Sequence, residues 1–112
     1  MKFDLEERTA KFGESVIKFC RDLPQDEITK PIVNQPIKCA TSVGANYCEA
    51  DDAESGRDFK HKIGICKKES REAKHFLRMS VVAAPNIKEQ ARVLWSEAKE
   101  LNLIFNAIYK KV

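Results

Sequence analysis

The chain is poor in the residues that make turns and in long apolar runs. It has four glycines and four prolines among 112 residues, too few for an all-β fold with its many short strands. No apolar run is long enough to span a bilayer. Acidic residues follow almost at once after the first methionine, which excludes a signal peptide. These absences predict a cytoplasmic protein that is not built mainly from strands.

Motifs for catalysis are also missing. The sequence has no glycine-rich phosphate loop, no Gly-x-Ser-x-Gly and no histidine at a known catalytic spacing from a cysteine. None of the four cysteines (Cys20, Cys39, Cys48 and Cys66) belongs to a Cys-x-x-Cys pair, so zinc-binding and thioredoxin-like sites are poorly supported. We expect small buried thiols in a reducing compartment. The sequence therefore predicts no enzyme and no cofactor.

The residues that are present predict one helical domain over residues 1–112. The chain is 43% apolar and 33% charged, as in a globular protein, and its net charge is +3. A first helix is expected from about Asp4 to Leu23, ended by Pro24. Its core residues alternate steps of four and three: Leu5, Thr9, Phe12, Val16, Phe19 and Leu23.

A second helix is expected from about Thr29 to Asp51, with Thr29 as its cap. Its apolar stripe is Val33, Ile37, Ala40, Val43 and Tyr47. Pro36 conflicts with a helix interior, so two alternatives stay open: a kink at Pro36, or a separate turn over residues 31–35. Gly44 predicts a close approach of another backbone.

Two further helices complete the pattern. Ser55 and Asp58 predict a capped start for a third helix that ends near Ala84, and Asn86 with Glu89 predicts the same for a fourth. Their core residues are Phe59, Ile63, Cys66, Ser70, Ala73, Leu77 and Ser80, then Ile87, Ala91, Leu94, Ala98, Leu101, Phe105, Ile108 and Val112. Four amphipathic helices with short links predict an antiparallel, up-down-up-down four-helix bundle.

Apolar residues beyond these core lines predict self-association. Val93, Trp95, Leu103 and Ile104 lie off the core line of the fourth helix. A small bundle cannot enclose all of them, so some should be exposed on the monomer.

A line of polar residues follows the second and third helices. Its members are Gln35, Lys38, Ser42, Asn46, Glu49, Glu69 and Glu72. A di-iron carboxylate site would need a further Glu-x-x-His motif besides Glu72-x-x-His75, so we predict no metal. An antiparallel hairpin would place Lys38 opposite Glu69, and we expect this polar seam to fix the register of the bundle.

The outer face of the third helix is basic. Between Arg57 and Arg78, eight Lys/Arg and three Asp/Glu give a balance of +5, which leaves −2 for the rest of the chain. An arc of about 140° holds only cations, histidines and one glycine. Its members are Arg57, Lys60, His61, Gly64, Lys67, Lys68, Arg71, Lys74, His75 and Arg78. Such a stripe suits a phosphate backbone, although it can also be a solvated face. No aromatic residue interleaves with it in the sequence, so base stacking is not expected.

Several of these segments together resemble a known family. The strongest is Thr41-Ser-Val-Gly-Ala-Asn-Tyr-Cys-Glu-Ala50, supported by Asn34-Gln35, Asp58-Phe59, Lys68-Glu69 and Phe76-Leu77. They resemble the four-helix-bundle proteins related to those encoded in intervening sequences of bacterial 23S ribosomal RNA genes. Two positions depart from the family pattern: Pro36 replaces an apolar helix former, and Phe76 replaces a common tryptophan.

The resemblance implies a left-handed four-helix bundle that assembles into a ring-like homopentamer without enzyme activity. It also implies RNA binding, suspected from gene context, and a distant relative serves a retroelement reverse transcriptase as a nucleic-acid-binding accessory. Our hypothesis is therefore a bundle that binds RNA or DNA through Arg57, Lys60, Lys67, Lys68, Arg71, Lys74 and Arg78. The alternative is an oligomer that docks another protein and binds no nucleic acid.

Overall fold

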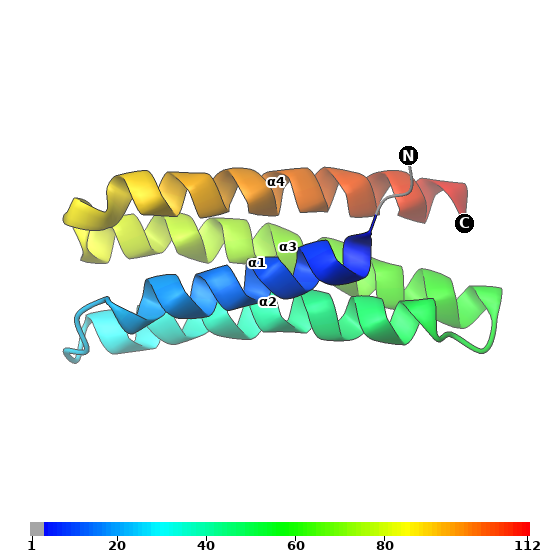
Figure 1. The fold of residues 1–112 in the computed structure, drawn as a ribbon, viewed down its shortest axis with the longest axis horizontal. Coiled ribbons are helices and arrows are strands. Elements are labelled where there is room, and N and C mark those ends of the chain that lie inside the picture. The colour runs from blue at the N-terminus through cyan, green and yellow to red at the C-terminus, as the bar shows by residue number, and fades with distance from the viewer. Residues whose placement is uncertain (1–3) are drawn as a thin grey trace.

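The computed structural model describes residues 4–112 and contains four long helices. They are α1 (Leu5–Arg21), α2 (Thr29–Asp51), α3 (Gly56–Ala83) and α4 (Lys88–Lys111), and a short 3-10 helix, η1 (Pro85–Ile87), precedes α4. The helices lie along the long axis of a body measuring 44 × 28 × 20 Å, with links at alternate ends (Figure 1). The all-α four-helix fold predicted from the sequence is confirmed, and the left-handed sense of the bundle stays a prediction.

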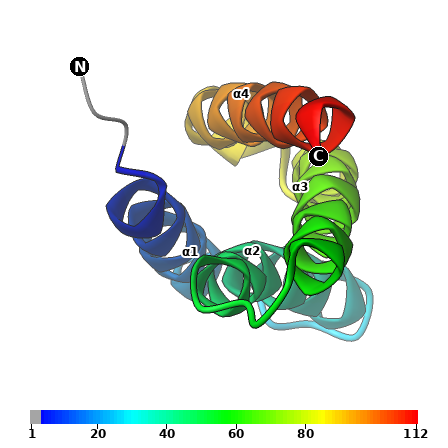
Figure 2. The ribbon, with the colours of Figure 1, turned by 90° about the vertical axis from the view of Figure 1, so that its right-hand side faces the viewer.

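The four helices are arranged as an arc in chain order (Figure 2). Contacts are most extensive between α2 and α3 and between α3 and α4, and among the pairs of long helices that touch they are least extensive between α1 and α4. No helix within residues 4–112 has a stretch long and apolar enough to cross a membrane.

The predicted core lines form the core of the arc. All six predicted core residues of the first helix are buried, as are those of α3 except Phe59, which is half-buried. The line on α4 is buried from Ile87 to Phe105, but Ile108 is only half-buried and Val112 is 51% exposed. The last turn of α4 therefore extends past the core, which the repeating pattern alone did not predict.

Helix starts were predicted correctly in one case and wrongly in two. The Ser55 hydroxyl accepts a hydrogen bond from the Asp58 N–H at 3.0 Å, as expected. Thr29 is not the cap of α2, because the carboxylate of Asp26 accepts from the backbone N–H groups of Ile28 and Thr29 at 3.1 and 2.8 Å. Asn86 does not cap α4 either: η1 occupies that position, and no side chain in the described part of the chain caps the N-terminus of α4. Capping sequences thus indicated the right regions but not always the right residue.

α2 continues through Pro36, which is buried. A separate turn over residues 31–35 is therefore wrong. Close approach at Gly44 is confirmed, since a Cβ atom placed there would lie 3.5 Å from the backbone oxygen of Thr9. Gly13 of α1 faces α2 in the same way, with the Ala40 oxygen 3.6 Å from an added Cβ. The two glycines let α1 and α2 pack closely.

Candidate nucleic-acid interface

The predicted basic arc lies on the outer side of α3. Six of its ten members are exposed: Arg57, His61, Lys68, Arg71, His75 and Arg78. Lys60, Gly64, Lys67 and Lys74 are half-buried, because this edge of the arc faces α4. Lys74, which the sequence predicts on the outer face of the third helix, is thus partly covered.

Aromatic rings from α4 lie under this edge of the arc. The Nζ atoms of Lys60 and Lys67 lie 4.8 and 4.5 Å from the centre of the Tyr109 ring. Those of Lys74 and Lys99 lie 5.4 and 5.6 Å from the centre of the Trp95 ring. Ammonium groups at such distances are attracted to the electron-rich ring faces. The arc on α3 contains no aromatic residue of its own, as its sequence shows, but the packing of α4 brings two aromatic rings beside it.

The sequence predicts no residue of α4 in the candidate interface, although α4 carries a stripe of suitable residues. Lys88, Arg92, Trp95 and Lys99 are spaced by four, three and four residues, which places them on one face of a helix. That spacing is visible in the sequence. Only the packing of α4 against α3 shows that the stripe adjoins the basic arc.

A groove of about 630 Å³ lies where the C-terminal part of α3 meets the N-terminal part of α4. Its lining surface is mostly apolar, and none of its lining residues in the described chain is acidic. The lining residues are Leu77, Arg78, Val81, Val82, Lys88, Ala91, Arg92, Trp95 and Ser96. The groove therefore combines an apolar surface with three cations.

A smaller and more polar groove of about 300 Å³ follows along the same two helices. It is lined by Lys67, Lys68, Arg71, Glu72, Asn102 and Asn106. The Asn102 side chain donates to the backbone oxygen of Lys67 at 2.7 Å, and the Asn106 side chain donates to the backbone oxygen of Asn102 at 2.9 Å. The basic arc itself contains no acidic residue, but Glu72 brings one negative charge to its border.

The predicted polar seam between α2 and α3 is only partly made of paired groups. Lys38 is exposed and forms no ion pair with any residue of the described chain, so the structure does not pair it with Glu69. The ion pair between these helices is instead Glu49 with Lys62, at 2.8 Å. Asn46 donates to the backbone oxygen and the hydroxyl of Ser42 at 2.9 and 3.0 Å, and Gln35 is half-buried.

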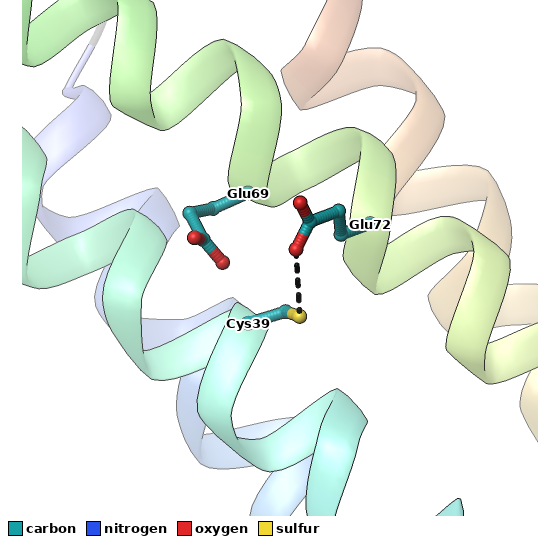
Figure 3. A group of neighbouring side chains, drawn as sticks. All are labelled: Cys39, Glu69 and Glu72. Atoms are coloured by element: carbon teal, nitrogen blue, oxygen red, sulfur yellow. Dashed lines mark hydrogen bonds between the residues drawn. The ribbon is translucent and has the colours of Figure 1, made fainter.

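Cys39 takes the place that Lys38 was expected to fill. Its buried thiol faces the half-buried carboxylates of Glu69 and Glu72 (Figure 3), and one donor atom from each residue lies within 4.8 Å of the others. The Sγ–Oε2 distance between Cys39 and Glu72 is 3.9 Å. Burial, with the two negative charges, raises the pKa of the Cys39 thiol to about 12. A metal ion would need this thiol as a thiolate, so the absence of a metal site stays our prediction.

The remaining cysteines separate into two kinds. Cys20 and Cys66 are buried, and their thiols donate to the backbone oxygens of Val33 and Val43, each at 3.6 Å. Burial raises the pKa of Cys20 to about 11 and that of Cys66 to about 12, which disfavours a reactive thiolate. Cys48 is exposed, contrary to the expectation that all four thiols are buried.

Exposed apolar residues also lie on α4. Val93 and Leu103 are 69% and 58% exposed, which confirms that residues off the core line of α4 reach the surface. Trp95 and Ile104 are half-buried. Between α1 and α4, a groove of about 460 Å³ is lined by Ser15, Lys18, Phe19, Asp22, Gln90, Val93 and Leu94.

Comparison with known proteins identifies relatives of the fold and of the sequence. Residues 1–107 match the family described as 23S rRNA-intervening sequence protein. A crystal structure of a protein of unknown function from the S23 ribosomal protein family of Bacteroides thetaiotaomicron is similar, with a TM-score of 0.85. The two chains are 24% identical, and the match covers 96% of this chain and 99% of the other. No curated protein was found to match the chain.

Proposed function

Because this chain belongs to the family of 23S rRNA-intervening sequence proteins, we propose that it is a non-enzymatic, oligomeric four-helix bundle that binds RNA or DNA backbone. The proposed site is the basic face of α3. It comprises Arg57, Lys60, Lys67, Lys68, Arg71, Lys74 and Arg78.

One observation carries this proposal: the cations of α3 and α4 form a single surface. Arg71 and Arg78 are exposed one above the other on α3. Lys88 and Arg92 of α4 line the same groove as Arg78. A strand of phosphates laid along α3 would meet several cations at once, and each cation that pairs with a phosphate would release counterions.

The test is binding of a labelled, structured RNA and of duplex DNA across a salt series. Affinity should fall steeply with salt, and sequence should matter little. For each cation–phosphate pair that a substitution removes, the log–log salt slope should decrease by about 0.7 with a single strand, or by about 0.9 with B-DNA. A protein that binds neither nucleic acid at low salt would refute the proposal.

Two matched variants locate the site. Arg71→Glu with Arg78→Glu reverses two exposed cations of the proposed face, and we expect it to abolish binding. Lys11→Glu with Lys18→Glu makes the same charge change at exposed positions of α1, and it should weaken binding far less. If both variants lose binding equally, only net charge matters. If the first variant binds like the wild type, the site lies elsewhere.

The proposed assembly is a homopentamer, as the family resemblance implies. The exposed Val93 and Leu103 support self-association, because burying these apolar side chains in an interface lowers the free energy of the protein. Light scattering at micromolar concentration should give about five times the chain mass of 12.8 kDa. A monomer at that concentration would contradict the proposed pentamer but would not affect the conclusion on the four-helix fold.

The second candidate function is a protein–protein assembly module that binds no nucleic acid. It is favoured by the same exposed apolar residues and by the groove between α1 and α4, which lies away from the basic face. An oligomer that binds no RNA or DNA at low salt would support this candidate against the first.

A further inference from the structure

We propose that the groove between α3 and α4 holds an unpaired nucleobase stacked on Trp95, so that the ligand is single-stranded nucleic acid or an unpaired loop. The inference rests on the proposed nucleic-acid binding and adds to it the class of ligand. It differs from backbone binding, which needs no aromatic residue and does not distinguish paired from unpaired strands.

The groove has the size and composition of a site for a flat apolar group. Its volume of about 630 Å³ lies within the range of about 300–1,000 Å³ found for small-molecule sites. Leu77, Val81 and Val82 form its apolar wall on α3, and Val82 is 77% exposed. Trp95 is half-buried, so packing holds the indole in place while part of it stays accessible. Every nucleobase has a flat face that can stack on such a ring.

The charges around the groove suit phosphate. Arg78 stands on the α3 side, and Lys88 and Arg92 stand on the α4 side. An apolar peptide would fit the groove floor, but it would leave these three cations without partners. A nucleotide uses both features, because its base can cover the apolar floor while its phosphates lie beside the cations.

Lys74 and Lys99 add cations next to the ring itself. Their Nζ atoms lie 5.4 and 5.6 Å from the ring centre, and lysine side chains have four rotatable bonds. A base that stacks on the indole can therefore displace a lysine head group toward the flanking phosphate. The attraction to the ring is then replaced by an ion pair.

A second ring lies further along the same face. Tyr109 is 14 residues beyond Trp95 on α4, which corresponds to roughly 21 Å of helix. Lys60 and Lys67 lie over this second ring, and the polar groove with Asn102 and Asn106 lies between the two rings. An extended strand can thus meet a ring, polar groups and a second ring in succession. A duplex cannot do so, because its bases are stacked inside the helix.

The experiment uses the fluorescence of Trp95, the single tryptophan of the chain. The full-length protein is titrated with a labelled pyrimidine single strand, with an abasic strand of the same length and with a duplex. The anisotropy of the label reports binding, and tryptophan emission reports stacking. We expect the single strand to bind more tightly than the abasic strand and to quench emission in proportion to the bound fraction. The abasic strand and the duplex should not quench it.

Variants distinguish the loss of stacking on the Trp95 ring from a loss of folded structure. Trp95→Leu should weaken single-strand binding between about 5-fold and about 150-fold, the range for loss of one base–aromatic stack. Abasic-strand binding should stay unchanged, and Trp95→Phe should restore most of the single-strand affinity. Phe76→Leu is the matched control. It removes a half-buried ring that belongs to α3 and does not line the groove, and this variant is expected to bind like the wild type. Circular dichroism of each variant checks that the helices are retained.

The outcomes distinguish the two proposals. If single and abasic strands bind equally well and emission does not change at saturation, the stacking inference is wrong while backbone binding stands. If Trp95→Leu binds the single strand like the wild type, the inference is also wrong. If no strand binds at low salt, both proposals fail together.

Discussion

Arg8 of α1 joins Glu97 of α4 by two hydrogen bonds, from Nε to Oε2 and from Nη2 to Oε1, each 2.7 Å long. Glu100 accepts a third bond from the same guanidinium at 3.2 Å. Among the pairs of long helices that touch, α1 and α4 pack least extensively, and this ion pair joins them. The side chains of Arg8 and Glu97 are 27% and 29% exposed, so water screens the pair only in part. A planar guanidinium matches a carboxylate in this two-pronged geometry, which makes the pair stronger than most surface ion pairs.

Arg8→Ala should therefore destabilise the protein by about 1–2 kcal/mol. A double-mutant cycle with Glu97→Ala, measured by urea unfolding, should give a coupling energy of about 1 kcal/mol. Glu14→Ala, at an exposed position of α1, should change the free energy of unfolding by less than about 0.5 kcal/mol. Effects of Arg8→Ala and Glu97→Ala that simply add would show that the pair contributes nothing.

Gly44 should accept alanine but not leucine. An added Cβ lies 3.5 Å from the Thr9 oxygen, which is an ordinary van der Waals distance. Gly44→Ala should therefore raise the free energy of unfolding by up to about 1 kcal/mol through helix propensity. Gly44→Leu must push α1 away and should cost about 1–3 kcal/mol. Ala45→Leu, at an exposed neighbouring position, is the control. A stable Gly44→Leu protein would contradict the close packing of α1 and α2.

Stability should fall in alkaline solution because of Cys20. Burial raises the pKa of this thiol from 9.0 to about 11. Between these pH values the unfolded chain has lost the proton and the folded chain keeps it, so the folded state loses stability as pH rises through this range. Below pH 9 the contribution is complete. The loss from this group is at most about 3 kcal/mol.

Unfolding of Cys20→Ala across the same pH range checks this prediction. The variant should show a shallower decline of stability above pH 9 than the wild type. Cys48→Ala, which removes the exposed thiol, should show the wild-type slope. Equal slopes in all three proteins would assign the alkaline loss to other groups.

Divalent metal should leave the melting temperature unchanged. Cys39, Glu69 and Glu72 offer three donor atoms within 4.8 Å. The thiol must give up its proton to bind a metal ion, and its pKa of about 12 opposes this at neutral pH. Thermal unfolding with and without Zn²⁺ or Mn²⁺ tests the point, using Cys48→Ser protein to remove the exposed thiol. A metal-dependent rise that disappears in Glu69→Gln would establish a site between α2 and α3.

Much of the fold was predictable because helix periodicity records burial directly. Leu5, Phe12 and Val16 had to share one face, and Ile63 and Leu77 had to share another, so the helices and their inner sides followed from spacing alone. Caps were less predictable, because several side chains near a helix start can accept from the same N–H groups. Asp26 accepts in place of Thr29, since it lies three residues before Thr29, the first residue of α2, and its carboxylate reaches forward to the Thr29 N–H. The sequence does not decide whether α2 passes through Pro36, because packing determines whether the missing hydrogen bond is tolerated.

The candidate site was predictable only along α3. The cations from Arg57 to Arg78 share one helix, so their common face follows from sequence spacing. Trp95 and Tyr109 belong to α4, and only the packing between helices brings them beside Lys74 and Lys67. The sequence predicted Lys38 opposite Glu69, whereas the structure places Cys39 there, and packing is again the cause. A one-residue difference turns a helix by about 100° and exchanges an exposed cation for a buried thiol.

The arc of helices has a consequence for how the protein opens. α3 packs extensively against both α2 and α4, whereas α1 packs on α2 and has fewer contacts with α4, among them the Arg8 ion pair. Detaching α1 thus breaks one extensive interface and one small one, whereas detaching α3 breaks two extensive interfaces. In native-state hydrogen exchange, we expect the amides of α1 to exchange through a partial opening that costs less free energy than global unfolding. The amides of α3 should exchange only through global unfolding. α1 is then a separate cooperative unit, docked on a three-helix remainder.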